Sequence, residues 1–124
     1  MARLLLLDVE NEVVKEVEVG QSDLDKFHTL LNCRCFDITS RQIGGRYFDI
    51  FCDDEGLLMD DPKISAIDIE LQPMLVGNLI FANHDGEGNT TDLSDDDIQH
   101  IRKNIKHICT NKYPLGYPML MCAY

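Results

Sequence analysis

Most side chains in this sequence that could do chemistry are carboxylates, and they gather between Asp53 and Asp97. That stretch holds thirteen acidic residues and one base, Lys63, in a chain of net charge −11. A surface of one sign attracts oppositely charged partners and speeds their association. A plain solvated surface is the alternative interpretation. We predict a partner-binding surface made of the acids that have no expected task in capping a helix: Asp53, Asp54, Glu55, Asp60, Asp61, Asp85 and Glu87.

A calcium site is the sharpest metal hypothesis that these acids allow. Counted from Asn83, an EF-hand-like loop would have Asp85 third, Glu87 fifth and Gly88 sixth, where the motif needs glycine. Position twelve is Ser94 instead of the bidentate glutamate, and a strand is expected before the loop. We therefore predict no metal site. A small-ligand or calcium-binding module that sequesters its ligand, monomeric or oligomeric, remains the alternative function.

Other chemistry has weaker support. Cys33 and Cys35 supply two ligands where zinc needs four, and the odd total of five cysteines favours free thiols and no cofactor. No nucleophile elbow surrounds Ser22 or Ser94, and the four histidines are scattered, so we predict a protein that is not an enzyme and has no catalytic residues. Net negative charge opposes direct nucleic-acid binding. A small basic patch is interpreted as the solvated end of a helix: Arg102, Lys103, Lys106 and Lys112.

Length and composition indicate one globular domain, residues 1–124, large enough to bury a single core. The first apolar run, Leu4–Leu7, stops at Asp8, which is shorter than a signal peptide or a membrane span requires. We therefore expect a soluble, cytoplasmic protein without membrane contact.

Alternation and turn residues predict the elements of the first half. Arg3–Asp8 and Val13–Val19 are expected to form a hairpin with one buried face, and a helix over Asp23–Leu31 is capped by Ser22. Cys35–Ile43 and Arg46–Cys52 flank Gly44-Gly45, which predicts a second hairpin with a tight primed turn.

In the second half, Met74–Ala82 is the most continuous apolar run, and we predict one strand there in the middle of the sheet. Ser94 is expected to cap a second helix, whose apolar stripe continues to Ile108. The apolar tail, residues 110–124, would add a final strand or contact a second copy as a homodimer. The predicted fold class is α+β, a small and mostly antiparallel sheet of hairpins packed against two helices.

The order of these motifs resembles a domain-of-unknown-function family of small proteins carried by bacterial phages and plasmids. The resemblance covers about Leu4–Ile108 and rests on four pieces: Ile43-Gly44-Gly45-Arg46-Tyr47-Phe48-Asp49, Asp53-Asp54-Glu55-Gly56-Leu57-Leu58, Met74-Leu75-Val76-Gly77 and Leu93-Ser94-Asp95. This sequence has acids where the family often has a neutral residue before its Glu-Glu-Gly turn.

That resemblance brings no catalytic residues to this chain, but it implies a setting. Small acidic proteins of mobile elements often block host defences. We therefore expect a non-enzymatic inhibitor, anti-CRISPR or anti-restriction, whose acidic and DNA-mimicking surface binds the basic groove of a host nucleic-acid-processing protein.

Overall fold

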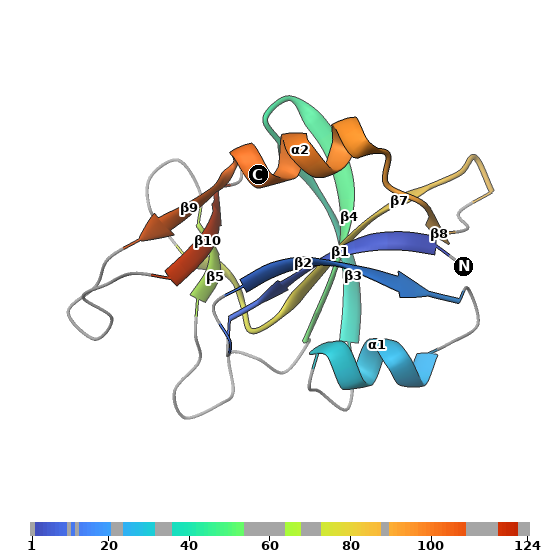
Figure 1. Cartoon of the computed structure of the whole chain (residues 1–124), viewed down its shortest axis with the longest axis horizontal. Helices are drawn as coiled ribbons and strands as arrows, with labels where there is room; N and C mark the ends of the chain where they lie inside the picture. The colour runs from blue at the N-terminus through green and yellow to red at the C-terminus, as the bar shows by residue number, and fades with distance from the viewer. Residues whose placement is uncertain are drawn as a thin grey trace.

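The computed structural model describes residues 2–9, 11, 13–20, 24–31, 36–53, 64–67, 73–87, 90–108 and 117–121. In these ranges the chain forms two helices and two β-sheets (Figure 1). Ser22 and the Asp54-Glu55-Gly56-Leu57-Leu58 part of the motif named above lie outside the described residues.

The first sheet has the strand order β2-β1-β7-β4-β3, with neighbouring strands antiparallel throughout. A short strand, β8, extends it by pairing with the far end of β7. Its strands are β1 (Ala2–Asp8), β2 (Val13–Val19), β3 (Phe36–Ile43), β4 (Arg46–Asp53), β7 (Leu79–His84) and β8 (Thr90–Thr91).

Each face of this sheet carries one helix, so the sheet lies between two layers (Figure 1). The helix α1 (Leu24–Leu31) buries Phe27 and Leu31 on one face, and α2 (Asp95–Lys103) buries Ile98 and Ile101 on the other. The inner strands β1 and β7 are therefore apolar on both faces, with alternate residues in the two cores. Leu4, Leu6, Ile80 and Ala82 belong to the core under α1, whereas Leu5, Leu7, Leu79 and Phe81 belong to the core under α2.

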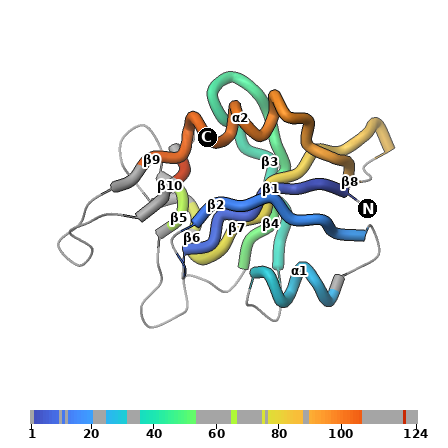
Figure 2. The backbone as a smooth tube through the Cα atoms, in the orientation of Figure 1, coloured from blue at the N-terminus to red at the C-terminus, as the bar shows by residue number. Residues whose placement is uncertain are grey.

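The second sheet lies to one side of the first (Figure 2). Its order is β6-β5-β10-β9, with β5 (Ile64–Ile67), β6 (Pro73–Val76), β9 (Ile105–Ile108) and β10 (Tyr117–Met121). The β5–β10 pair is parallel and the other pairs are antiparallel. Ala66 and Leu120 are fully buried and contribute to the core under α2, which joins the two sheets.

The predicted fold class is confirmed, and so are both hairpins, the first helix as far as it is described (Leu24–Leu31), and the start of the second helix at Ser94. The Gly44-Gly45 turn has φ values of 55° and 89°, the left-handed region that glycine enters without strain. It connects Ile43 and Arg46, which face each other in the β3–β4 ladder.

The single strand predicted over Met74–Ala82 is wrong, because the run is two strands in different sheets. Gly77 has a φ of 77° and breaks the run between β6 and β7. The buried Asn78 then fixes the start of β7. Its Oδ1 accepts from the Val9 N–H at 3.0 Å, and its Nδ2 donates to the Leu30 carbonyl at 2.9 Å.

The second helix is shorter than its apolar stripe predicted. It ends at Lys103, and Asn104 closes the last turn by donating its N–H to the Ile101 carbonyl at 3.0 Å and its Nδ2 to the His100 carbonyl at 2.8 Å. Ile105 and Ile108 belong to β9, which is held by ladder pairing with β10. Ile105 and Ile108 therefore continue the spacing of the helix in the sequence, although they lie in a strand whose partner comes later in the chain.

The described part of the apolar tail is an interior strand of the same chain. β10 pairs with β5 on one side and with β9 on the other. Of the two predicted roles of the tail, the final strand is the one found at Tyr117–Met121, and a homodimer contact through the tail stays a prediction. Over the parts of the chain described above, no helix combines the length and the apolar character needed to cross a membrane.

Candidate protein-binding surface

The predicted acidic surface divides in the structure. Asp54, Glu55, Asp60 and Asp61 lie outside the described residues. Of the remaining three, Asp53 ends β4, whereas Asp85 and Glu87 are exposed in the turn between β7 and β8.

Strand register places Asp53 far from the β7–β8 turn. In the β4–β7 ladder, Asp49 faces Ala82 and Phe51 faces Ile80, so β4 runs toward the beginning of β7 and away from its end. By this register Asp53 is level with Asn78, and the seven positions from Asn78 to Asp85 span about 23 Å at the rise of a strand. One compact surface does not contain both residues.

A different group of acids does gather at one end of the first sheet, which we call the acidic end. The β7–β8 hairpin leads directly into α2, because Asn83 faces Thr91 and the helix begins four residues later. The β7–β8 turn and the start of α2 therefore lie at the same end of the first sheet (Figure 1). The acidic end comprises Asp85, Glu87, Asp92, Asp95, Asp96 and Asp97.

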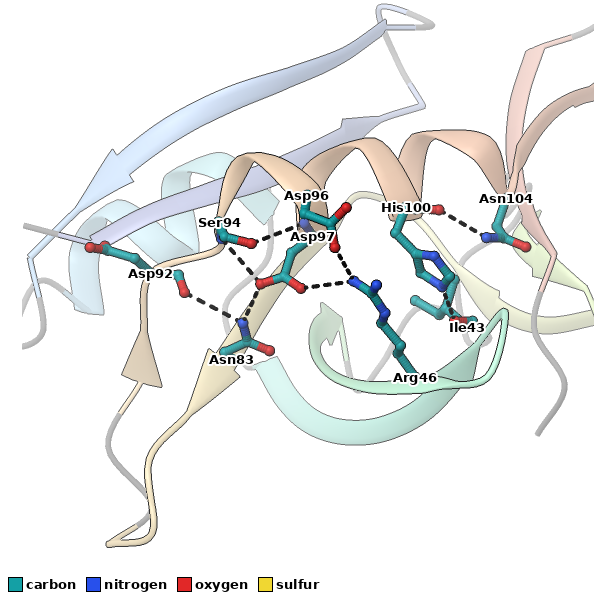
Figure 3. A network of polar contacts seen from close by, with 9 residues as sticks. All are labelled: Ile43, Arg46, Asn83, Asp92, Ser94, Asp96, Asp97, His100 and Asn104. Atoms are coloured by element: carbon teal, nitrogen blue, oxygen red, sulfur yellow. Dashed lines mark hydrogen bonds and ion pairs between the residues drawn. The ribbon is translucent and has the colours of Figure 1, made fainter.

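Ser94 starts α2 as its N-cap, as the sequence predicted, and the structure adds a capping box in which Asp97 takes part. The Asp97 N–H donates to Ser94 Oγ at 3.1 Å, and the Ser94 N–H donates to Asp97 Oδ2 at 3.1 Å. Asn83 adds a third donor, with Nδ2 2.9 Å from Asp97 Oδ2 (Figure 3). Burial disfavours the Asp97 carboxylate, but hydrogen bonds from Ser94 and Asn83 and the charge of Arg46 outweigh it and lower its pKa.

Arg46 reaches the acidic end from the Gly44-Gly45 turn. Its Nη1 lies 2.8 Å from Asp96 Oδ2 and 3.4 Å from Asp97 Oδ1 (Figure 3). The turn is held under α2 because His100 Nε2 contacts the Ile43 carbonyl at 2.7 Å. A carbonyl accepts only, so His100 carries a proton on Nε2.

Arg3 fixes the other side of the acidic end to β1. Its backbone N–H donates to Asp92 Oδ1 at 2.6 Å, and its Nη2 lies 2.8 Å from Asp95 Oδ1. The Leu93 N–H donates to the Arg3 carbonyl at 2.9 Å, so the segment before α2 follows β1. Of the six carboxylates of the acidic end, that of Asp95 contacts the Arg3 guanidinium and those of Asp96 and Asp97 contact the Arg46 guanidinium, so an excess of negative charge remains.

This excess is presented to solvent. The side chains of Asp95 and Asp96 are 85% and 75% exposed, although each has an arginine contact. Asp85 and Glu87 are exposed as well, and the Glu87 N–H donates to Asp85 Oδ1 at 2.9 Å, which shapes the turn. Fixed, exposed carboxylates of this kind can accept hydrogen bonds from lysine and arginine side chains.

A second polar group lies on the face of the sheet that carries α1. Asp49 accepts from Ser40 Oγ at 3.0 Å, and its other oxygen lies 2.9 Å from His84 Nδ1. Asp49 stands between the serine and the histidine, so the histidine has no contact with the hydroxyl that it would need to activate. The geometry differs from that of a hydrolytic triad.

The Asn83–Thr91 loop does not have the form of an EF-hand. Asn83 and His84 pair with Thr91 and Thr90 in an antiparallel ladder, so the ends of the loop form strands instead of wrapping around an ion. The Asn83 side chain donates to Asp97. Within the described residues, no group of three or more His, Cys, Asp or Glu side chains could hold a metal. Cys52, the cysteine in these ranges, is buried.

Asp92, Asp95 and Asp96 were not predicted to belong to the binding surface, because all acids near the start of α2 were assigned to capping that helix. A capping box needs a carboxylate only at its third helical position, which Asp97 fills. Applied to the sequence, this rule assigns only Asp97 to capping and would have identified Asp95 and Asp96 as available surface acids. The contacts with Arg3 and Arg46 required the fold.

Comparison with known proteins gives one result. A family model described as a domain of unknown function (DUF3846) matches residues 2–106. The matched range includes the first sheet, both helices and the whole acidic end, and it stops before β10. Neither the curated proteins nor the solved structures contain a match to the chain.

Proposed function

Because the chain belongs to the DUF3846 family, whose description assigns no activity, we propose a function from its own surface: a binding protein whose acidic end enters a basic groove of a host nucleic-acid-processing protein. The observation that supports this most is the gathering of six carboxylates at one end of the first sheet. The finer form of the proposal is a non-enzymatic inhibitor from a phage or other mobile element, directed at a CRISPR or restriction nuclease.

Charge supports this proposal in two ways. The chain as a whole has a net charge of −11, so attraction to a basic groove would act over the approach as well as at contact. At the acidic end, Asp95, Asp96 and Asp97 are fixed by the first turn of α2, so little side-chain and backbone entropy is lost when their carboxylates are bound. Grooves that hold phosphates through lysine and arginine would accept carboxylates in the same places.

The test measures binding to a purified nuclease from which nucleic acid has been removed. We expect affinity to fall as salt rises, and DNA to compete with the protein for the groove. The double variant Asp85→Lys/Glu87→Lys should weaken binding by roughly tenfold or more, because it replaces attraction with repulsion. Glu18→Lys/Asp25→Lys is the matched control, since both residues are exposed on β2 and α1 and the change in net charge is the same.

Equal losses in the two double variants would assign the effect to net charge and overturn the acidic end as the contact surface. Affinity that stays constant between about 0.05 and 0.5 M salt would overturn the electrostatic mechanism altogether. Asp53→Lys separates the two ends of the sheet, because a loss with this variant alone would return the site to the far end of β4.

A further inference from the structure

We propose that the edge strand β3 pairs with β3 of a second copy, so that two chains form a symmetric dimer with one continuous sheet. The proposed contact does not involve the acidic end. β3 and β2 are the two edges of the first sheet, and each leaves one row of backbone groups without a strand partner among the described residues.

The turn next to β3 determines which residues offer these groups. Ile43 and Arg46 flank a two-residue turn, so they form a hydrogen-bonded pair, and every second residue before Ile43 also directs its backbone toward β4. Ile38 and Ser40 therefore point their N–H and carbonyl groups outward. The Ile38 N–H agrees with this, since it donates to Asp37 Oδ1 at 3.0 Å.

Two charges on β3 lack an ion pair within the described chain. Asp37 and Arg41 project from the same face of the strand, and four residues separate them by about 13 Å, too far to contact each other. Neither takes part in a salt bridge among the described residues, and the Nε of Arg41 is buried without a hydrogen-bond acceptor.

Antiparallel pairing of β3 with itself brings these charges together. When Thr39 faces Thr39 of the second copy, each Asp37 faces Arg41 of the other copy, and two equal ion pairs form about the two-fold axis. These positions are non-hydrogen-bonded pairs, where opposing Cα atoms lie about 4.5 Å apart and side chains are closest. The same register brings Ile38, 52% exposed in the monomer, diagonally beside its own copy.

The other edge strand does not have this complementarity. Two-fold pairing of β2 places Lys15 opposite itself, Glu16 opposite itself, or Glu16 opposite Glu18, and like charges directly across a ladder repel. Lys26 also donates its Nζ to the Glu18 carbonyl. β3 is therefore the edge that self-pairing favours, and the occupant is a second copy of this chain.

Sedimentation equilibrium of the full chain over a concentration series tests the dimer. We expect a dimer for the wild type, and a dissociation constant raised roughly tenfold or more by Asp37→Arg or by Arg41→Asp, since each change turns two attractions into repulsions. The exchange Asp37→Arg/Arg41→Asp restores both pairs with reversed sign and should return the constant to within about threefold of the wild type. Lys15→Glu on β2 is the control and should have no effect.

A wild-type chain that remains monomeric up to about 1 mM would overturn the proposal, as would a charge exchange that does not rescue dimerisation. Circular dichroism checks that each variant is folded. If a single variant fails to fold, Ile38→Lys is tested in its place. The backbone N–H of residue 38 points away from β4 and toward the proposed partner strand, and a lysine side chain on an edge strand opposes strand pairing. A dimer unchanged by Ile38→Lys would also exclude the β3 interface.

Discussion

Asp97 has two roles at the residue scale that helices often give to different side chains. It closes the capping box with Ser94, and it also receives Asn83 and Arg46 from two other strands. These partners stabilise its charged form, which lowers its pKa although the group is partly buried. The ionised Asp97 therefore connects α2, β4 and β7 at one carboxylate.

We predict that Asp97→Asn lowers the free energy of unfolding by about 1 kcal/mol at neutral pH. Because the pKa of Asp97 is lower in the folded chain than in the unfolded chain, its contribution is complete above the unfolded value of about 3.9 and disappears as pH falls through the folded value. Urea unfolding at pH 7 and below pH 4 measures this: the difference between wild type and variant should shrink in acid. Asp95→Asn, at a side chain that is 85% exposed, is the control. A difference that does not depend on pH would contradict the assigned role of the charge.

At the scale of elements, the β3–β4 turn and α2 must approach very closely. A Cβ on Gly44 would lie 2.8 Å from His100 Nε2 and 2.9 Å from Asn104 Nδ2, whereas a Cβ on Gly45 would meet nothing within 4 Å. Both glycines have positive φ, so they differ in the room available for a Cβ and not in backbone conformation. The turn thereby fixes the position of the Arg46 backbone, which determines the acids that the Arg46 side chain can reach.

Gly44→Ala should therefore cost more stability than Gly45→Ala. We expect about 1 kcal/mol for Gly45→Ala from the left-handed backbone alone, and a further 1–3 kcal/mol or so for Gly44→Ala from displacement of the helix contact. Thermal and urea unfolding of the two variants give the comparison directly. Equal losses would mean that α2 moves away from the turn without cost.

How much of these elements the sequence predicts depends on whether the cause is local. The Gly44-Gly45 turn and the N-cap at Ser94 were predicted because their geometry is set within a few residues. The division at Gly77 and the end of α2 at Lys103 were not, because β6 and β9 are defined by partners far along the chain. For the same reason, the sequence predicted only part of the acidic end. Asp85 and Glu87 could be read from the sequence, whereas their separation from Asp53 follows from strand order.

The whole molecule depends on one core that both sheets share. Leu120 is fully buried in it beside α2, although it comes from β10 in the second sheet. We predict that Leu120→Ala lowers the free energy of unfolding by about 2–5 kcal/mol, through lost burial and the cavity left behind. Urea denaturation measures the change. Tyr47→Ala is the control at a side chain that is 69% exposed, and it should stay within about 0.5 kcal/mol. A small loss at Leu120 would mean that the second sheet folds without support from the first.

The parallel pairing of β5 with β10 has a consequence for the order of events during synthesis. More than fifty residues separate Ala66 from its partner Leu120, and β10 is translated after every strand that it contacts. The first sheet can complete its ladders while the growing chain still lacks β10, whereas β5 is then paired with β6 alone and β9 has no strand partner among the described residues. A nascent chain would therefore expose the unpaired β9 and one open edge of β5 for the time the ribosome needs to reach residue 121, on the order of seconds at about 5–20 residues per second.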